Sequence, residues 1–258
     1  MTQTQLTDGP TEDMLPVWSA DGTRVFFGSR RLGNFDVYSQ AADGASPARV
    51  EFAAPEFQVP IAVTPDGKTL IVLDRYRDLF LLDFARPDQL QPLLQSRFDE
   101  RLGEVSPDGR WIAYESDESG KQFEVILRSF PNVHDRREVI SGGGGRYPRW
   151  GPKGSNELYY LQPDGAMMAA SLRLSPTFEV GSSRKLFDWR RPAPSVSGRE
   201  YDVAPDGRFL VAEATETISD RQTEVSVILN WRPTLQAACW PVSRASGAVY
   251  PFLKSFTR

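Results

Sequence analysis

The sequence predicts an all-β fold built from repeated four-stranded antiparallel sheets, and its main sign is a short turn phrase that recurs along the chain. The phrase contains Asp-Gly at residues 21–22, 66–67, 108–109 and 206–207, and a degraded copy, Trp-Gly-Pro-Lys-Gly, stands at 150–154. Periods of about 40–50 residues, as here, are typical of stacked supersecondary units. Asp and Gly favour such turns because the Asp side chain caps the backbone and glycine accepts positive φ. The residues expected to form structural turns are Asp21, Gly22, Asp66, Gly67, Asp108, Gly109, Asp206 and Gly207.

Each turn phrase stands between runs of strand-forming residues, which is the second observation. The third copy is the clearest: residues 102–106 precede the turn, and the runs 110–116, 123–128 and 137–140 follow it, separated by polar loops. This is the pattern of a four-stranded antiparallel meander. The same division gives blades at about 16–52, 59–94, 101–140, 147–187 and 199–231. Repeated four-stranded sheets of this length predict a β-propeller, here with five blades.

The fifth blade lacks an obvious fourth strand, and the N-terminus offers a substitute. Residues 4–7 precede the first blade, where an outer strand would stand if the chain began in the middle of a blade. We expect them to pair beside residues 224–231 and so close the ring, because an open propeller would leave a long unpaired sheet edge. The propeller domain is thus expected over residues 1–232. Residues 233–258 do not fit the repeat and are expected to form a loosely attached tail.

The composition excludes several classes of protein. The net charge is -4, whereas a general nucleic-acid binder carries a basic field, so no nucleic-acid partner is expected. The single cysteine, Cys239, excludes an intrachain disulfide framework and a multi-cysteine zinc site. No apolar run approaches the roughly 18 residues of a membrane span, and the N-terminus has no apolar signal region. A free-standing chain of this kind is expected in the cytoplasm.

Three phrases connect the repeat to a known family. They are Pro16–Gly22, Ser29–Tyr38 and Val105–Tyr114, which contain the turn, the loop and the strands of a repeat unit. In these residues the chain resembles the WD40-like PD40 repeats of TolB-type propellers, which usually have six blades. More narrowly, Tyr201–Leu210 followed by Val227–Trp231 resembles the end of the C-terminal propeller of certain bacterial Ser/Thr protein kinases. In that family the propeller follows a kinase domain and usually a membrane helix, and neither is in this sequence. As an alternative function, the resemblance implies the extracytoplasmic sensor of a kinase-type receptor, with a small molecule or a sugar in the central funnel.

The sequence contains no recognisable assembled set of catalytic residues. The only histidine, His134, lies in a polar connection, and no Gly-x-Ser-x-Gly nucleophile motif occurs. The run Gly142–Gly145 leads into a strand and not into the helix that a phosphate-binding loop requires. We therefore expect no enzyme, no cofactor and no metal site. The alternative that remains is a glycosidase, in which paired carboxylates act as acid and base. Its candidate residues come from the first strands or the segments leading into them: Asp13, Glu56, Asp99, Glu100, Glu104 and Asp202.

The leading prediction is a non-enzymatic scaffold that binds a protein or peptide through loops at one end of the ring. Arginine and aromatic residues are over-represented at binding hot spots, and two segments that lead into blades combine them. These segments supply the candidate residues Arg97, Phe98, Arg101, Arg146, Tyr147 and Arg149. The scaffold is expected to be a monomer.

Overall fold

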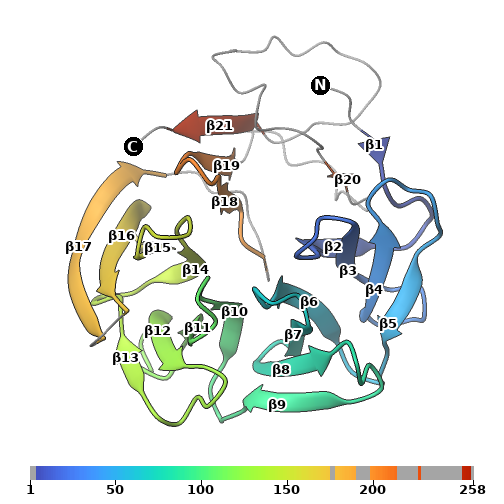
Figure 1. Cartoon of the computed structure of the whole chain (residues 1–258), viewed down its shortest axis with the longest axis horizontal. Coiled ribbons are helices and arrows are strands. Elements are labelled where there is room, and N and C mark those ends of the chain that lie inside the picture. Colours follow the sequence, from blue (N-terminus) through green and yellow to red (C-terminus); the bar gives the residue numbers. More distant parts are fainter. Residues whose placement is uncertain (1–3, 175–177, 190–197, 214–225, 228–251, 257–258) are drawn as a thin grey trace.

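The computed structural model describes residues 4–174, 178–189, 198–213, 226–227 and 252–256. In this part of the chain every regular element is a β-strand, and the sheets stand around a common axis like the blades of a propeller (Figure 1). The predicted all-β propeller is therefore confirmed. No helix of the described residues is long and apolar enough to cross a membrane.

Four complete sheets follow one another along the chain, and in each of them the strands keep their sequence order. The first sheet contains β2 (Asp13–Trp18), β3 (Arg24–Ser29), β4 (Asp36–Ala41) and β5 (Arg49–Phe52). The second contains β6 (Gln58–Val63), β7 (Thr69–Asp74), β8 (Asp78–Asp83) and β9 (Leu90–Leu94). The third contains β10 (Glu100–Val105), β11 (Trp111–Ser116), β12 (Glu124–Ser129) and β13 (Arg137–Val139). The fourth contains β14 (Arg146–Trp150), β15 (Glu157–Leu161), β16 (Ala166–Arg173) and β17 (Glu179–Asp188).

The fifth sheet draws a strand from the far end of the chain. It contains β18 (Tyr201–Val203), β19 (Phe209–Glu213) and β21 (Phe252–Phe256), in that order. The sequence analysis gave the position beside β19 to residues 224–231 and treated residues 233–258 as a tail outside the repeat. The structure instead pairs residues 252–256 with β19 along all five of its residues. Backbone pairing satisfies the free edge of β19 whatever side chains the partner carries, so the repeat pattern could not identify this strand. Cys239 lies outside the described residues.

The N-terminal strand pairs with a segment of the expected partner. Strand β1 (Thr4–Gln5) is antiparallel to β20 (Ser226–Val227), with Thr4 opposite Val227. These are the only residues of the range 224–231 that the structure describes. The pair forms a two-stranded sheet separate from the fifth, and Figure 1 shows it between the fifth and the first sheets. Both ends of the chain therefore contribute strands where the ring closes.

The Asp-Gly turns join the first and second strands of their sheets. In the second sheet, Asp66 Oδ1 accepts hydrogen bonds from the Thr64 hydroxyl at 2.7 Å and from the Lys68 backbone N–H at 3.1 Å. Asp21 and Asp108 accept the equivalent pairs of bonds in their own sheets. At Asp206 the hydroxyl is missing, because Ala204 stands in its place, and the backbone bond remains. The following glycines have φ between 70° and 85°, a region that disfavours residues with a Cβ.

Apolar side chains fill the space between neighbouring sheets, and they also fill the seam where the ring closes. Leu6 packs against Val25, Phe27 and Tyr38 on one face of the first sheet. The opposite face of that sheet packs on the second sheet. Leu6 therefore covers the apolar face that a preceding blade would otherwise bury.

Candidate functional site

The connections between strands alternate between the two ends of the ring, because all neighbouring strands are antiparallel. We call the end that carries the links between successive sheets, together with the loops between their second and third strands, the linker end. Backbone hydrogen bonds tie these segments into a belt across the sheets. Gln58 N–H donates to Phe35 C=O at 2.8 Å between the first and second sheets, and Gly145 N–H donates to Phe123 C=O at 2.9 Å between the third and fourth. The linker end is thus a connected frame, and most of the predicted binding residues lie on it.

Arg146 and Tyr147 are anchored by a buried carboxylate. Glu115 lies on β11 and is completely buried. Its oxygens accept a hydrogen bond from Arg146 Nη2 at 2.8 Å and another from the Tyr147 backbone N–H at 3.0 Å. Burial alone would lower the pKa of Arg146, but the hydrogen bond to Glu115 and the charges of Glu115 and Tyr147 together outweigh it and the pKa is raised. Arg146 is therefore a fixed cation whose guanidinium remains partly exposed.

Arg101 and Arg146 come from different sheets and meet at one aromatic ring. The Arg146 guanidinium lies 4.8 Å from the centre of the Phe123 ring, and that of Arg101 lies 5.3 Å from the same centre. Arg101 is also paired with Asp99. Phe123 and Glu115 were not among the residues that the sequence analysis selected, and the only sign of Phe123 was an aromatic residue at the end of a polar loop.

Arg97 and Phe98 lie on the link into β10. The Arg97 side chain is exposed and its guanidinium lies 4.8 Å from the centre of the Phe98 ring. The Arg97 carbonyl accepts a hydrogen bond from Arg77 Nη2 at 2.7 Å. The two candidate segments thus form neighbouring Arg–aromatic contacts.

Arg149 departs from the expected patch, because its side chain joins a charged cluster of the innermost strands. Its Nη2 donates to Asp202 Oδ1 at 2.6 Å, and its Nη1 lies 3.6 Å from Glu104 Oε1. Burial alone would lower the pKa of Arg149, but the two carboxylates outweigh it and the pKa is raised. The cluster links the third, fourth and fifth sheets.

A second arginine completes this cluster. Arg199 precedes β18, and Figure 1 shows the chain before β18 running toward the middle of the ring. Its Nε donates to Pro148 C=O at 2.8 Å and its Nη2 to Leu102 C=O at 2.6 Å. Both carbonyls lie at β-bulges of β10 and β14, where Leu102 and Tyr147 have positive φ. The bulges release these carbonyls from the ladder, and Arg199 satisfies them.

Comparison with known proteins identifies the family to which this fold belongs. A family model described as the TolB beta propeller domain, PD40, matches residues 1–154, more than half of the chain. The chain belongs to the TolB β-propeller domain family. A search of curated protein sequences finds no match.

Solved structures agree with this assignment at the level of the fold. A putative TolB from Agrobacterium tumefaciens is 18% identical with a TM-score of 0.51, the match covering 67% of this chain and 65% of that one. TolB from Acinetobacter baumannii is 16% identical with a TM-score of 0.54, covering 72% and 46%. An oligogalacturonate lyase in complex with manganese is 11% identical with a TM-score of 0.51, covering 83% and 75%. The match spans less than two thirds of either TolB chain.

The six carboxylates weighed for glycoside hydrolysis lie in several separate contacts of this TolB-type propeller. Asp13 is buried and accepts from Arg31 Nη2 at 3.0 Å, while Glu56 is exposed. Asp99 pairs with Arg101, and Glu100 is buried beside Ser96. The last two, Glu104 and Asp202, share Arg149. Among the described residues no three His, Cys, Asp or Glu side chains form a group that could hold a metal ion. His134 is exposed in the loop between β12 and β13.

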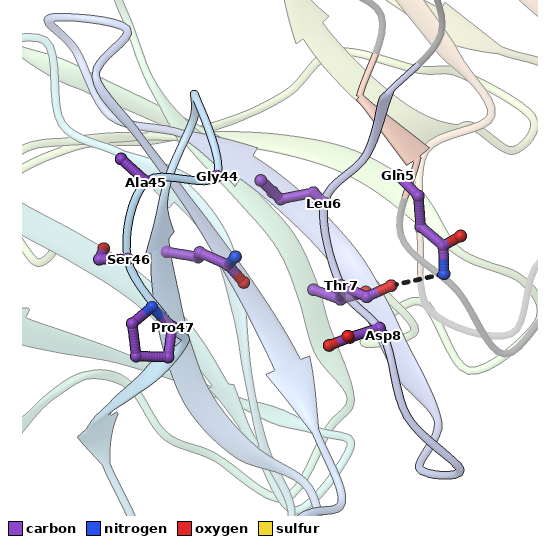
Figure 2. A pocket seen from close by; sticks show the side chains of 9 residues that line it. Gln5, Leu6, Thr7, Asp8, Gly44, Ala45, Ser46 and Pro47 are labelled. Atoms are coloured by element: carbon purple, nitrogen blue, oxygen red, sulfur yellow. Dashed lines mark hydrogen bonds between the residues drawn. The ribbon is translucent and has the colours of Figure 1, made fainter.

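A groove of about 520 Å³ lies at the seam of the propeller. One wall is the N-terminal segment and the other is the loop between β4 and β5, as Figure 2 shows. Gln5 Nε2 donates to the Thr7 carbonyl at 3.0 Å and stiffens the first wall. The lining residues are Gln5, Leu6, Thr7, Asp8, Gln40, Gly44, Ala45, Ser46 and Pro47. None of them belongs to the Arg–aromatic contacts of the linker end.

Proposed function

We propose that this TolB-type propeller is a non-enzymatic scaffold that binds a protein or peptide through the linker end of its ring. The observation that carries the proposal is the meeting of Arg101 and Arg146 on the Phe123 ring. Arginine and aromatic side chains dominate binding hot spots, and a guanidinium that is already held in place loses little conformational entropy when it binds. The buried Glu115 holds Arg146 in this way.

The charges around the axis support binding over hydrolysis. A glycosidase needs one carboxyl group kept protonated as an acid and a second as base or nucleophile. Glu104 and Asp202 instead both form ion pairs with the Arg149 guanidinium, so the two carboxylates join strands of different sheets. The arginine between these two carboxylates ties the third, fourth and fifth sheets together, which is a structural role for both acids.

The test compares capture of a partner by variants of the linker end. Arg146→Ala would leave Glu115 buried without its cation, which costs about 3–5 kcal/mol and would confuse binding with folding. Arg101→Ala and Arg146→Lys are better, since Lys keeps the charge but loses the planar contact with the aromatic ring. Arg49→Ala is the matched control, because Arg49 is an exposed, ion-paired arginine on the outer strand β5.

Proteins captured from source cells by the immobilised wild type would be identified, purified and titrated against all four proteins. We expect Arg101→Ala and Arg146→Lys to weaken binding about tenfold or more, as loss of a hot spot does, and Arg49→Ala to leave it unchanged. Equal binding by all variants would remove the linker end from the proposal. Turnover of a polysaccharide by the wild type would contradict the non-enzymatic assignment.

A further inference from the structure

The turn between β7 and β8 has backbone dihedral angles that are unfavourable for the residues it contains. Arg77 N–H donates to Asp74 C=O at 3.0 Å, which closes the turn around Arg75 and Tyr76. These two central residues have φ of 50° and 66°. Positive φ at both central positions is the mark of turns that prefer Asn-Gly, because a Cβ is strained there.

The equivalent loops of the other complete sheets use glycine. The loops between second and third strands have positive φ at Gly33 in the first sheet, Gly120 in the third and Gly165 in the fourth. In the second sheet the positions with positive φ carry Arg75 and Tyr76. Strained backbone in a folded protein is concentrated at functional sites. We therefore infer that the side chains of Arg75 and Tyr76 have a function that outweighs the strain in this turn.

Tyr76 is held from one side and presented on the other. Its ring stacks on Phe57, with the ring centres 3.7 Å apart, and Phe57 in turn makes an edge contact with Phe35. Phe35 and Phe57 are buried, whereas Tyr76 is 50% exposed. An aromatic ring fixed on a buried support and open to solvent has the form of an interface anchor.

The positively charged side chains on either side of Tyr76 are more exposed than the carboxylates they pair with. The Arg75 side chain is 60% exposed and lies 3.5 Å from the Asp74 carboxylate, which is only 11% exposed. The Arg77 side chain is 44% exposed, and its partner Asp99, at 3.6 Å, is 28% exposed. The guanidinium groups thus cover their carboxylate partners. Glu56, which precedes Phe57 in the chain, is an exposed carboxylate of the same link.

We propose that the turn surface, formed by Arg75, Tyr76 and Arg77 and supported from below by Phe57, docks an acidic segment of a partner protein. Tyr76 packs against the segment while Arg75 and Arg77 pair with its carboxylates, which guanidinium groups bind with two parallel hydrogen bonds. Arg77 also donates to the Arg97 carbonyl, so the turn surface is joined to the Arg–aromatic contacts of the linker end. This inference rests on the proposed function of that end as a protein-binding surface, and it adds the chemistry of the partner.

The experiment uses the double variant Arg75→Asn/Tyr76→Gly, which replaces the strained pair by the residues that the turn prefers. We expect a folded protein with a melting temperature no lower than that of the wild type. The control is Arg86→Asn, because Arg86 is an equally exposed, ion-paired arginine in the loop between β8 and β9, at the opposite end of the ring. The probe is a displayed library of random peptides, selected on the immobilised wild type and counted afterwards on the variants.

Selected peptides should be enriched in Asp and Glu, keep their affinity for the Arg86 control and lose about tenfold or more on the double variant. Failure to enrich acidic sequences overturns the inference, and so does equal binding to the double variant. A marked fall in its melting temperature would also overturn it, because Tyr76 would then serve packing on Phe57. Peptides that bind the double variant normally but lose affinity for Arg101→Ala would leave the proposed function intact and reject only the turn surface.

Discussion

Glu100 gives the sharpest test of how the linker end is stabilised. It begins β10, and its residue is only 4% exposed. One carboxylate oxygen accepts a hydrogen bond from the Ser96 hydroxyl at 2.9 Å, and the other, Oε2, has no hydrogen-bond partner in the described part of the chain. Burial raises the pKa of Glu100, and the nearby negative charge of Asp78 raises it further. Deprotonation of Glu100 therefore places a charge in surroundings that disfavour it.

Glu100→Gln keeps the acceptor for Ser96 and removes the charge. An unsatisfied buried polar atom costs about 1–3 kcal/mol, and more when it is charged. We expect the variant to be about 1–2 kcal/mol more stable than the wild type at neutral pH. The folded pKa lies above the unfolded value of about 4.3, so the wild type is most favoured when Glu100 is protonated. Its stability falls as the pH rises from the unfolded pKa through the folded one, and the advantage of the variant grows across the same window.

Urea unfolding of both proteins between about pH 4 and pH 8 measures this difference, provided the slope of free energy against urea is the same for both. Glu56→Gln, an exposed carboxylate on the same end of the ring, is the matched control and should change little at any pH. A variant less stable than the wild type at neutral pH would refute the argument. A gain that is equally large at pH 4 and pH 8 would refute it as well, because ionisation would then not be its source.

Three further substitutions test the packing, the axis and the turns. Gly28→Ala would place a Cβ 2.5 Å from the Val59 side chain in the neighbouring sheet, and we expect a loss of about 1–3 kcal/mol from overpacking; Gly142→Ala, with no atom within 4 Å of the new Cβ, should leave the melting temperature unchanged. Arg199→Ala would leave two bulge carbonyls without their donor, and we expect calorimetry to show a loss of about 2–4 kcal/mol. Asp66→Asn should remove an acid-sensitive contribution: hydrogen bonds lower the pKa of Asp66, so its stabilising effect is complete above pH ~4 and is lost as the pH falls through the folded pKa. Below pH 4, the free energy of unfolding measured with urea should therefore fall less steeply with decreasing pH in this variant than in the wild type.

The strands could be predicted because their causes are local. The Asp66 turn needs only a hydroxyl two residues before the carboxylate and an amide two residues after it, and this phrase is legible in the sequence. The third strand of the fifth sheet could not be predicted in the same way. Residues 252–256 pair with β19 across about forty intervening residues, and backbone pairing of this kind is open to any residue with a free N–H and C=O. No residue pattern in the sequence predicts such a pairing.

The site was predicted in part, for a similar reason. Arg101 and Arg146 were selected one by one from their composition and their place before a blade. Their contact depends on Phe123, which directly precedes β12, and on Glu115, which lies near the end of β11. Arg149 follows Arg146 closely in sequence, yet the β-bulge between them separates their environments. A change of direction within one strand is a property of backbone dihedral angles that composition does not reveal.

The backbone belt explains why loops at this end can form a binding surface at all. Ordering a loop upon binding costs about 1–2 kcal/mol for each residue whose backbone is fixed, so a loop surface is effective when it is ordered beforehand. Glu100 N–H donates to Arg77 C=O at the junction of the second and third sheets, and Gly145 N–H donates to Phe123 C=O at the next junction. The two bonds hold the turn surface and the Arg101–Phe123–Arg146 contact on one frame. A partner that reaches both would therefore meet groups whose spacing is already set, and loosening either junction should weaken its binding without removing any contact that it makes.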